Sequence, residues 1–412
     1  MLRNIIAIIT FKAAPVFGLV FLNLFLAAQW KQESYGNYSL VVGALFFVGP
    51  LLGAGMPELV TRKASIYSYQ NRVNAIAELH VKTITIIFSL VLLFYIALAF
   101  AEMVLHISFL SLLYTAPIVS LSLLSSAIRR AKGSVIVSQA IEAAFRLSII
   151  AFSLLALRFF QLNEPEIKLI YIASSLLILV FIYMEATTER GIKKNHVKFY
   201  KKSVYRVLVN MGQPFLVISI MQGLKNFGDL FVVGYLLGPS SAAIYSIALQ
   251  FVVILSFAQM VISVLMSRKI SWALKTKQIS TLNKWIENYK KYSLIIGLFV
   301  YFPIILIGHG LSNALLGENY QEALSIFAIL GIGRLFHLHA GPVMQILALS
   351  NLQKAASNVT ILVGIFNITI SLILVSYFGL IGAAISGSLS IALWAYLLKK
   401  KVRLLIPELM SI

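Results

Sequence analysis

Charged residues inside long apolar stretches are the part of this sequence best suited to chemistry. The stretches contain four basic and two acidic residues of this kind: Lys12, Arg146, Lys225, Arg334, Glu142 and Asp229. A charge at bilayer depth costs about 2.5–3.5 kcal/mol on insertion scales, so it usually faces a cavity or a partner. Arginine binds phosphate oxygens in a bidentate way, and lysine acts as a point charge. The excess of cations predicts a binding site for an anion.

Two of these cations lie four residues from an acid. Glu142 precedes Arg146, and Lys225 precedes Asp229, so each couple can meet on one helix face. Two interpretations follow, because each couple can be a neutralised structural pair or its members can line a cavity. The acids Glu142 and Asp229 are also candidates to bind H⁺ or Na⁺.

Arg334 and Lys12 have no acid at that spacing. Arg334 lies near the middle of its apolar stretch, which makes it the strongest candidate for contact with an anion. Lys12 lies near the start of the first stretch, and its long side chain can equally reach the membrane surface. His337 and His339 follow Arg334 but lie on different faces of a helix, so joint binding of a metal ion is not expected.

The composition indicates the class of protein that must hold these residues. Of 412 residues, 60% are hydrophobic and only 12% are charged, and the mean hydropathy is +0.91. Soluble domains are about half apolar and a quarter charged, so we expect a polytopic membrane protein. The net charge of +20 lies in short runs between apolar segments, which argues against nucleic acid as a partner. The sequence has no cysteine, Walker loop or HExxH motif, and no cofactor or metal is predicted.

Twelve segments approach the length of about 20 apolar residues that a membrane-spanning helix needs. The predicted spans are 5–28, 38–57, 82–101, 107–127, 135–157, 168–186, 207–236, 240–266, 291–309, 321–349, 355–377 and 379–398. The connections 58–81 and 267–290 mix apolar and basic residues, and helices lying on the inner surface are one interpretation of them. The expected fold class is therefore all-α.

The distribution of Lys and Arg predicts the orientation of the chain. Residues 190–206 contain seven basic residues and no acid, and alternating spans place this run on the same side as most other basic residues. The opposite connections contain only Lys31, Arg158 and Lys168. By the positive-inside rule the basic side is cytoplasmic, so both termini are expected in the cytoplasm.

The two halves of the chain share an internal pattern. Each of the ranges 38–62 and 245–268 begins with a Tyr-Ser pair and ends at the arginine of an Arg-Lys pair. The two ranges have nearly the same length and the same direction. The sequence therefore predicts two pseudo-symmetric six-helix lobes, 1–189 and 207–412, joined by the basic cytoplasmic linker 190–206. Parallel repeats recur in transporters, with the substrate path between the halves.

Four motifs resemble one family of transporters. They are YGNYSL in the second span, GDLFVVGYLLGPSSAAIYSIA, LLGENYQEAL and FGLIGAAISGSLS. Together with the two sets of six spans, they resemble the polysaccharide-exporter branch of the MATE-like (MOP) superfamily over essentially the whole chain. Within that branch the sequence looks most like the O-antigen flippases of the Wzx type. The resemblance implies a MATE-like V-shaped transporter in the cytoplasmic (inner) membrane of a bacterium.

The resemblance also implies a substrate and a direction of transport. These flippases move an undecaprenyl-pyrophosphate-linked oligosaccharide from the inner to the outer leaflet by alternating access, for lipopolysaccharide and surface polysaccharide biosynthesis. Arg334, Arg146, Lys225 and Lys12 are then expected to bind the pyrophosphate, and membrane lipids and other polysaccharide assembly proteins are expected partners.

Two alternatives remain at this point. One is an H⁺- or Na⁺-coupled multidrug exporter of the same superfamily, and the other is an integral membrane polysaccharide polymerase. The net basic interior favours an anionic substrate over cationic drugs. The short outer connections argue against an enzyme, because they leave little room for a catalytic domain.

Overall fold

The computed structural model describes residues 2–70, 72–105, 109–159, 162–188, 202–276, 278–350 and 352–409, and these contain helices and no strand. The elements of the first half are α1 (Leu2–Gln29), α2 (Gln32–Leu52), α3 (Met56–Tyr69), α4 (Val73–Leu105), η1 (Leu110–Thr115), α5 (Ala116–Ala131), α6 (Val135–Leu157) and α7 (Glu164–Thr188). Those of the second half are α8 (Lys202–Leu237), α9 (Pro239–Lys275), α10 (Ile279–Leu316), η3 (Glu318–Tyr320), α11 (Glu322–Ala340), α12 (Val343–Leu349) and α13 (Gln353–Leu405).

Eleven candidate spans in the described residues are long and apolar enough to cross a membrane, and the last of them contains a hairpin. This helix, α13, has 53 residues and turns at Gly379, where φ is 57° and ψ is −135°, a backbone region open to glycine. Asn367 donates a hydrogen bond to Ser390 and Trp394 donates one to Thr360, so the halves of α13 run antiparallel. With α13 counted as two spans, the predicted twelve membrane-spanning helices are confirmed.

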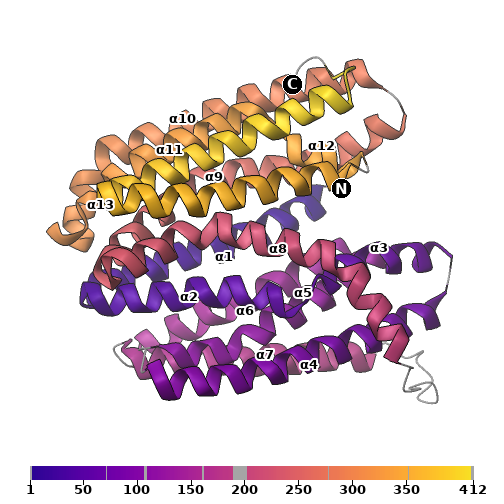
Figure 1. The fold of residues 1–412 in the computed structure, drawn as a ribbon, viewed down its shortest axis with the longest axis horizontal. Coiled ribbons are helices and arrows are strands. Elements are labelled where there is room, and N and C mark those ends of the chain that lie inside the picture. The colour runs from indigo at the N-terminus through magenta and orange to yellow at the C-terminus, as the bar shows by residue number, and fades with distance from the viewer. Residues whose placement is uncertain are drawn as a thin grey trace. The chain divides into compact units, whose positions relative to one another are not determined.

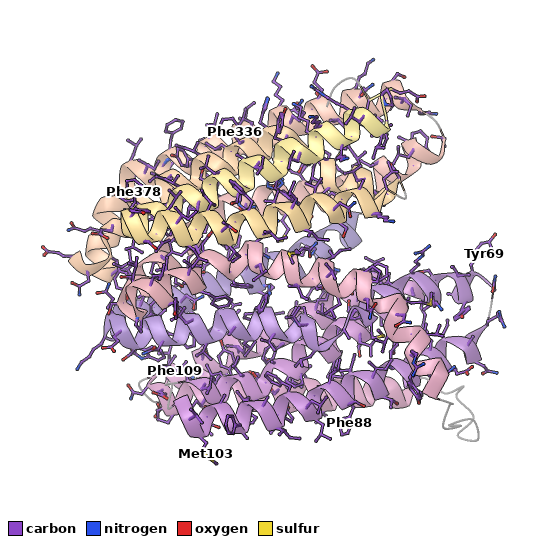
Figure 2. All side chains as sticks on the ribbon, in the orientation of Figure 1. Tyr69, Phe88, Met103, Phe109, Phe336 and Phe378 are labelled. Atoms are coloured by element: carbon purple, nitrogen blue, oxygen red, sulfur yellow. The ribbon has the colours of Figure 1, made fainter. Side chains whose placement is uncertain are left out.

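Large apolar side chains face outward, as a bilayer requires. On α4, Phe88, Ile96 and Met103 recur at helical spacing and are all well exposed. Figure 2 shows Phe88 and Met103 directed away from the ribbon, as are Phe336 on α11 and Phe378 on α13. The chain is a multi-pass membrane protein.

The predicted span 321–349 is not one helix. α11 ends at Ala340, and α12 begins at Val343. Gly341 between them has a φ of 87°, and Pro342 has no N–H to continue the helical hydrogen bonds. Apolar length alone does not predict this break, because the Gly-Pro pair lies inside a continuous apolar stretch.

The predicted connections also differ from expectation. Residues 58–81 contain the short helix α3, which is separated from α2 by Ala54 and Gly55 with φ values of 48° and 70°. Residues 267–290 instead lengthen α9 and α10, so the interpretation of a separate surface helix there is wrong. α9 continues to Lys275 and α10 begins at Ile279, and no glycine or proline interrupts either of these extensions.

The chain forms two compact units. Unit 1 comprises Met1–Leu22 and Val41–Ile220, and unit 2 comprises Asn23–Leu40 and Met221–Ile412. These ranges differ from the predicted lobes because α1, α2 and α8 each supply residues to both units. The predicted linker 190–206 lies outside the described residues as far as position 201, and α8 begins at Lys202.

Each unit has its own apolar core. In unit 1, Leu59 of α3, Ile87 of α4 and Leu124 of α5 belong to one buried cluster. In unit 2, α11 packs along both α9 and α13, and α10 packs against α9 and α11 (Figure 1). Ile286 of α10 and Leu398 of α13 are fully buried at one end of that bundle.

Three of the motifs noted in the sequence meet within unit 2. The Gly36 backbone of YGNYSL packs against the Pro239 carbonyl so tightly that a Cβ atom would lie 1.8 Å from its oxygen. The ring of Tyr35 packs edge-on against Tyr320 of the GENY segment, with 6.5 Å between centroids. Gln32 donates a hydrogen bond of 3.1 Å to the Ser240 carbonyl. These motifs are therefore packing features of the fold.

Candidate functional site

The predicted site residues form two clusters of charge, one in each unit. In unit 1 the centre is Glu142 on α6. Its Oε1 atom accepts a hydrogen bond of 2.5 Å from Ser126 and forms an ion pair with Arg130, and both partners lie on α5. Arg130 also donates to the Ser126 hydroxyl at 3.2 Å, and Ser126 is 2.9 Å from Ser138. These contacts join α5 to α6 through polar groups.

Arg146 does not form the ion pair expected from its spacing to Glu142. Its guanidinium lies 4.8 Å from the centroid of the Phe46 ring, a cation–π contact in place of an ion pair. The two residues are still near enough for their charges to attract. Arg146 is at the midpoint of α6 and is exposed, so it faces an open space at membrane depth. Because a lipid-facing arginine there would be costly, we infer that this space is hydrated.

Lys12 of α1 belongs to the same cluster. Its ammonium lies within the range of the charges of Glu142, Arg130 and Arg146. The side chain is half-buried. Lys12 is therefore turned toward the other charged groups of unit 1.

Glu58 is a fifth charged residue at this cluster. It lies in the first turn of α3, outside the candidate spans, and its side chain is exposed. Desolvation by the protein around it raises the pKa of its carboxyl group, while the positive charge of Arg130 lowers the pKa and Glu142 raises it. An accessible carboxyl group that is still surrounded by protein fits the wall of a narrow wet cavity.

The cluster in unit 2 contains Arg334 and His337 of α11. A guanidinium nitrogen of Arg334 is 3.5 Å from His337 Nδ1, and His337 Nε2 is 3.3 Å from the side-chain nitrogen of Gln259 on α9. The Nε atom of Arg334 is buried and has no hydrogen-bond partner within the protein. Arg334 therefore has donor capacity that the described protein groups do not use.

Lys225 of α8 lies beside Arg334, near enough for the two positive charges to repel. Its ammonium is 3.8 Å from the centroid of the Trp394 ring on α13, and the same ring packs edge-on against His337 at 5.1 Å. Among the described residues, neither Lys225 nor Arg334 forms an ion pair with a carboxylate. The structure thus brings together two cations that the sequence had placed on different helices, with no acid between them.

Asp229 does not pair with Lys225, contrary to the expectation from their spacing. Its Oδ1 atom accepts hydrogen bonds from Asn367 at 3.0 Å and from Ser386 at 3.5 Å, on the two halves of α13. The hydroxyl groups of Tyr245 and Ser371 also lie near the carboxylate. Neighbouring helices thus satisfy this buried acid, which has no need of the lysine on its own helix.

Two of the oxygens around Asp229 remain unsatisfied. Asn367 Oδ1 and the Ser371 hydroxyl are buried and have no hydrogen bond of normal length. A carboxylate with amide and hydroxyl oxygens is a donor set suited to a hard cation. Among the described residues, no group of three or more His, Cys, Asp and Glu side chains is arranged to hold a metal ion.

Comparison with known proteins identifies the fold. An inward-facing MATE multidrug resistance transporter of the MOP superfamily superposes with a TM-score of 0.79, over 98% of each chain and at 13% identity. The chain has the fold of the MATE transporters. The inward closed lipid II flippase MurJ has the same fold, with a TM-score of 0.72 at 13% identity over 98% of this chain and 88% of that one.

Sequence similarity extends to one curated flippase. The probable low-salt glycan biosynthesis flippase Agl15 of Haloferax volcanii is 24% identical over 226 residues, which are 53% of this chain and 47% of that protein. The matched part thus spans about half the length of the curated relative. No family model matches the sequence.

Four residues of the site are not among those predicted from the sequence: Arg130, Trp394, Asn367 and Ser386. All four act across helices, where spacing along one helix carries no information.

Proposed function

We propose that this chain is a flippase that moves an undecaprenyl-pyrophosphate-linked O-antigen repeat unit from the inner to the outer leaflet of the cytoplasmic membrane of a bacterium. The shared fold with MATE transporters and MurJ supports a membrane transport activity. The similarity to Agl15, a probable glycan biosynthesis flippase, supports a lipid-linked glycan as the cargo. Other polysaccharide assembly proteins are the partners that this role implies.

The observation that carries the proposal is the pair of neighbouring cations, Arg334 and Lys225, in unit 2. Two like charges at membrane depth repel each other, so a site that holds them together is completed by an anion. A diphosphate has enough charge and oxygens to bind both, with the planar guanidinium of Arg334 as the directional donor. The unused Nε donor of Arg334 supports this assignment.

The transport step needs no chemical bond to be made or broken. The lipid-linked saccharide enters from the inner leaflet, its diphosphate binds the cations, its sugars occupy water, and its polyprenyl tail stays in lipid. An inside-negative potential favours outward movement of an anion by about 2.3 kcal/mol per charge per 100 mV. For a doubly charged headgroup this is roughly 4.6 kcal/mol per 100 mV, which is enough to drive export.

The test is leaflet exchange of a fluorescent undecaprenyl-diphosphate saccharide in proteoliposomes. We expect wild-type protein to exchange it and Arg334→Gln to lose about 10- to 100-fold in rate, the value of one or two charge-assisted hydrogen bonds. Arg334→Lys keeps the positive charge but loses the planar, bidentate guanidinium, so its exchange rate should lie between those of wild type and Arg334→Gln. Arg158→Gln is the matched control, since Arg158 is an exposed arginine at the end of α6. Unchanged exchange in Arg334→Gln would refute the role of this residue.

The same preparation tests the alternative functions. The MATE fold equally supports a multidrug exporter coupled to H⁺ or Na⁺. Such a protein would move a cationic dye along an imposed ion gradient and ignore the lipid-linked saccharide. A polysaccharide polymerase would form new glycosidic bonds, which mass spectrometry of the extracted lipids would detect.

We further propose that Asp229 is the site of cation coupling, if transport is coupled. The unsatisfied Asn367 and Ser371 oxygens beside its carboxylate support Na⁺ or H⁺ as the ligand. Glu142, the second acid considered, is already ion-paired with Arg130 and is a weaker candidate.

A further inference from the structure

Unit 1 contains an acid in the middle of a cationic site, unlike the acid-free pair Arg334 and Lys225 of unit 2. Three cations, Lys12, Arg130 and Arg146, lie within the range of the charge of Glu142. Together with Glu58 there are three positive and two negative groups. A single carboxylate at the centre is therefore shared among more positive charge than it can neutralise.

The contacts of Glu142 are concentrated on one of its two oxygens. Oε1 binds Ser126 and Arg130, whereas Oε2 is only 3.5 Å from the side-chain nitrogen of Gln139. Arg146 and Lys12 make no ion pair with the carboxylate within the described residues, and Arg146 lies instead on the Phe46 ring. The carboxylate therefore uses only part of the donor capacity that surrounds it.

A phosphate or diphosphate group is a better match for this set of donors. It has more oxygens and more charge than a carboxylate, so it can bind Arg130, Arg146 and Lys12 at the same time. The Arg130–Glu142 pair is not sealed from water, since the side chains are 44% and 25% exposed. An exposed ion pair of this kind contributes about 0.2–1 kcal/mol, so a multivalent anion can displace the carboxylate.

We propose that Glu142 is a built-in counter-anion that occupies the anion site of unit 1 when no substrate is present, and that the diphosphate of the substrate displaces it and binds Arg130. The inference rests on the proposed function, because it names how the substrate anion is held and released. Arg130 becomes a further substrate ligand, and Glu142 sets the affinity by competing from within the protein.

Competition inside the protein has a definite thermodynamic effect. The apparent dissociation constant equals the intrinsic constant divided by the fraction of protein in which the site is open. Removal of the competing charge should therefore tighten anion binding and slow its release. A carboxylate that only braces α5 against α6 would have the opposite effect, since its loss would loosen the site.

The experiment measures binding of inorganic pyrophosphate to the full chain in phosphatidylcholine nanodiscs by calorimetry. We expect Glu142→Gln to bind pyrophosphate roughly two- to fivefold more tightly than wild type. This factor corresponds to the free energy of an exposed ion pair. Glu78→Gln is the matched control. It removes the same charge from an acid that is paired with Lys82 on α4, outside the cluster, and should leave the affinity unchanged.

A double-mutant cycle with Arg130→Gln isolates the pair. Arg130→Gln alone should weaken binding, and Glu142→Gln should then bring little or no gain, because the competitor has lost its partner. An equal gain in both backgrounds would mean a general charge effect and would overturn the inference. Unchanged or weaker binding by Glu142→Gln in a protein of wild-type thermal stability would overturn it as well.

Failure of the inference is distinguishable from failure of the proposed function. If neither wild type nor Glu142→Gln binds pyrophosphate, the counter-anion role is rejected. The proposed function is judged separately by leaflet exchange of the lipid-linked saccharide, with Arg334→Gln of unit 2 as its variant. Exchange without an effect of Glu142→Gln on pyrophosphate affinity would retain the function and reject the inference.

Discussion

The ammonium of Lys225 lies over the ring of Trp394, 3.8 Å from its centroid, while Asp229 on the same helix bonds to α13. The attraction between a cation and an aromatic face is worth about 0.5–2 kcal/mol. It fixes the position of Lys225 without neutralising it. The lysine therefore lies beside Arg334 without a carboxylate partner.

Trp394 is predicted to position Lys225 for anion binding. Trp394→Leu should weaken pyrophosphate affinity by roughly 2- to 30-fold, the range of a cation–π contact, whereas Trp394→Phe should lose less because an aromatic face remains. Calorimetry in nanodiscs measures both. Thr360→Val removes the acceptor of the Trp394 N–H and the bond from the Thr360 hydroxyl to the Ala356 carbonyl, but it leaves the ring face intact and should have little effect on affinity. Equal losses for the phenylalanine and leucine variants would show that the ring acts only by filling space.

Asp229 is predicted to make the stability of the protein depend on a bound cation. In wild type, Na⁺ in place of choline should raise the thermal midpoint, since a ligand that binds only the folded state stabilises it. Asp229→Asn should abolish that rise, and Asn367→Ala should reduce it. Glu318→Gln changes an exposed acid of unit 2 and serves as the control. A rise that persists in Asp229→Asn would place cation binding elsewhere.

The hairpin of α13 is predicted to be intolerant of a side chain at Gly382. A Cβ atom there would lie 2.0 Å from the Leu374 carbonyl oxygen, so Gly382→Ala forces backbone movement and should cost about 1–3 kcal/mol. Gly310 on α10 has nothing within 4 Å of its Cβ position, and Gly310→Ala should be neutral or stabilise by up to about 1 kcal/mol. Thermal unfolding in detergent compares the two. Equal midpoints would contradict the close contact.

Glu58 is predicted to make folding more favourable at lower pH. Desolvation raises the pKa of its carboxyl group in the folded state, so the folded protein binds a proton more readily than the unfolded chain does. The associated stability is present below the unfolded pKa and is lost as pH rises through the folded pKa. Glu58→Gln should therefore flatten this part of the stability profile and raise the thermal midpoint at neutral pH. The result to look for is a wild-type midpoint that falls between mildly acidic and neutral pH while the variant's does not; identical slopes would exclude the effect.

The sequence was a good guide to helices and a poor guide to their contacts. Apolar length predicted the spans, and the turn at Gly379 coincides with the start of the predicted span 379–398. The break at Gly341 was missed because the apolar stretch continues through it. Spacing along one helix suggested the pairs Glu142–Arg146 and Lys225–Asp229, but both acids bond to a neighbouring helix instead. Such partners depend on how helices rotate and pack, which hydropathy and spacing do not specify.

The hydrogen bonds of Asp229 also bear on how the protein is made. Asn367 and Ser386 lie 138 and 157 residues after it, both in α13, which is synthesised after α8. During synthesis the carboxylate of α8 is therefore in the membrane before its partners exist. A chain that ends before Gly379 would lack the hydrogen bond from Ser386 to this buried acid. The incompletely paired carboxylate would then distinguish unfinished copies from complete ones for the cell's proteases.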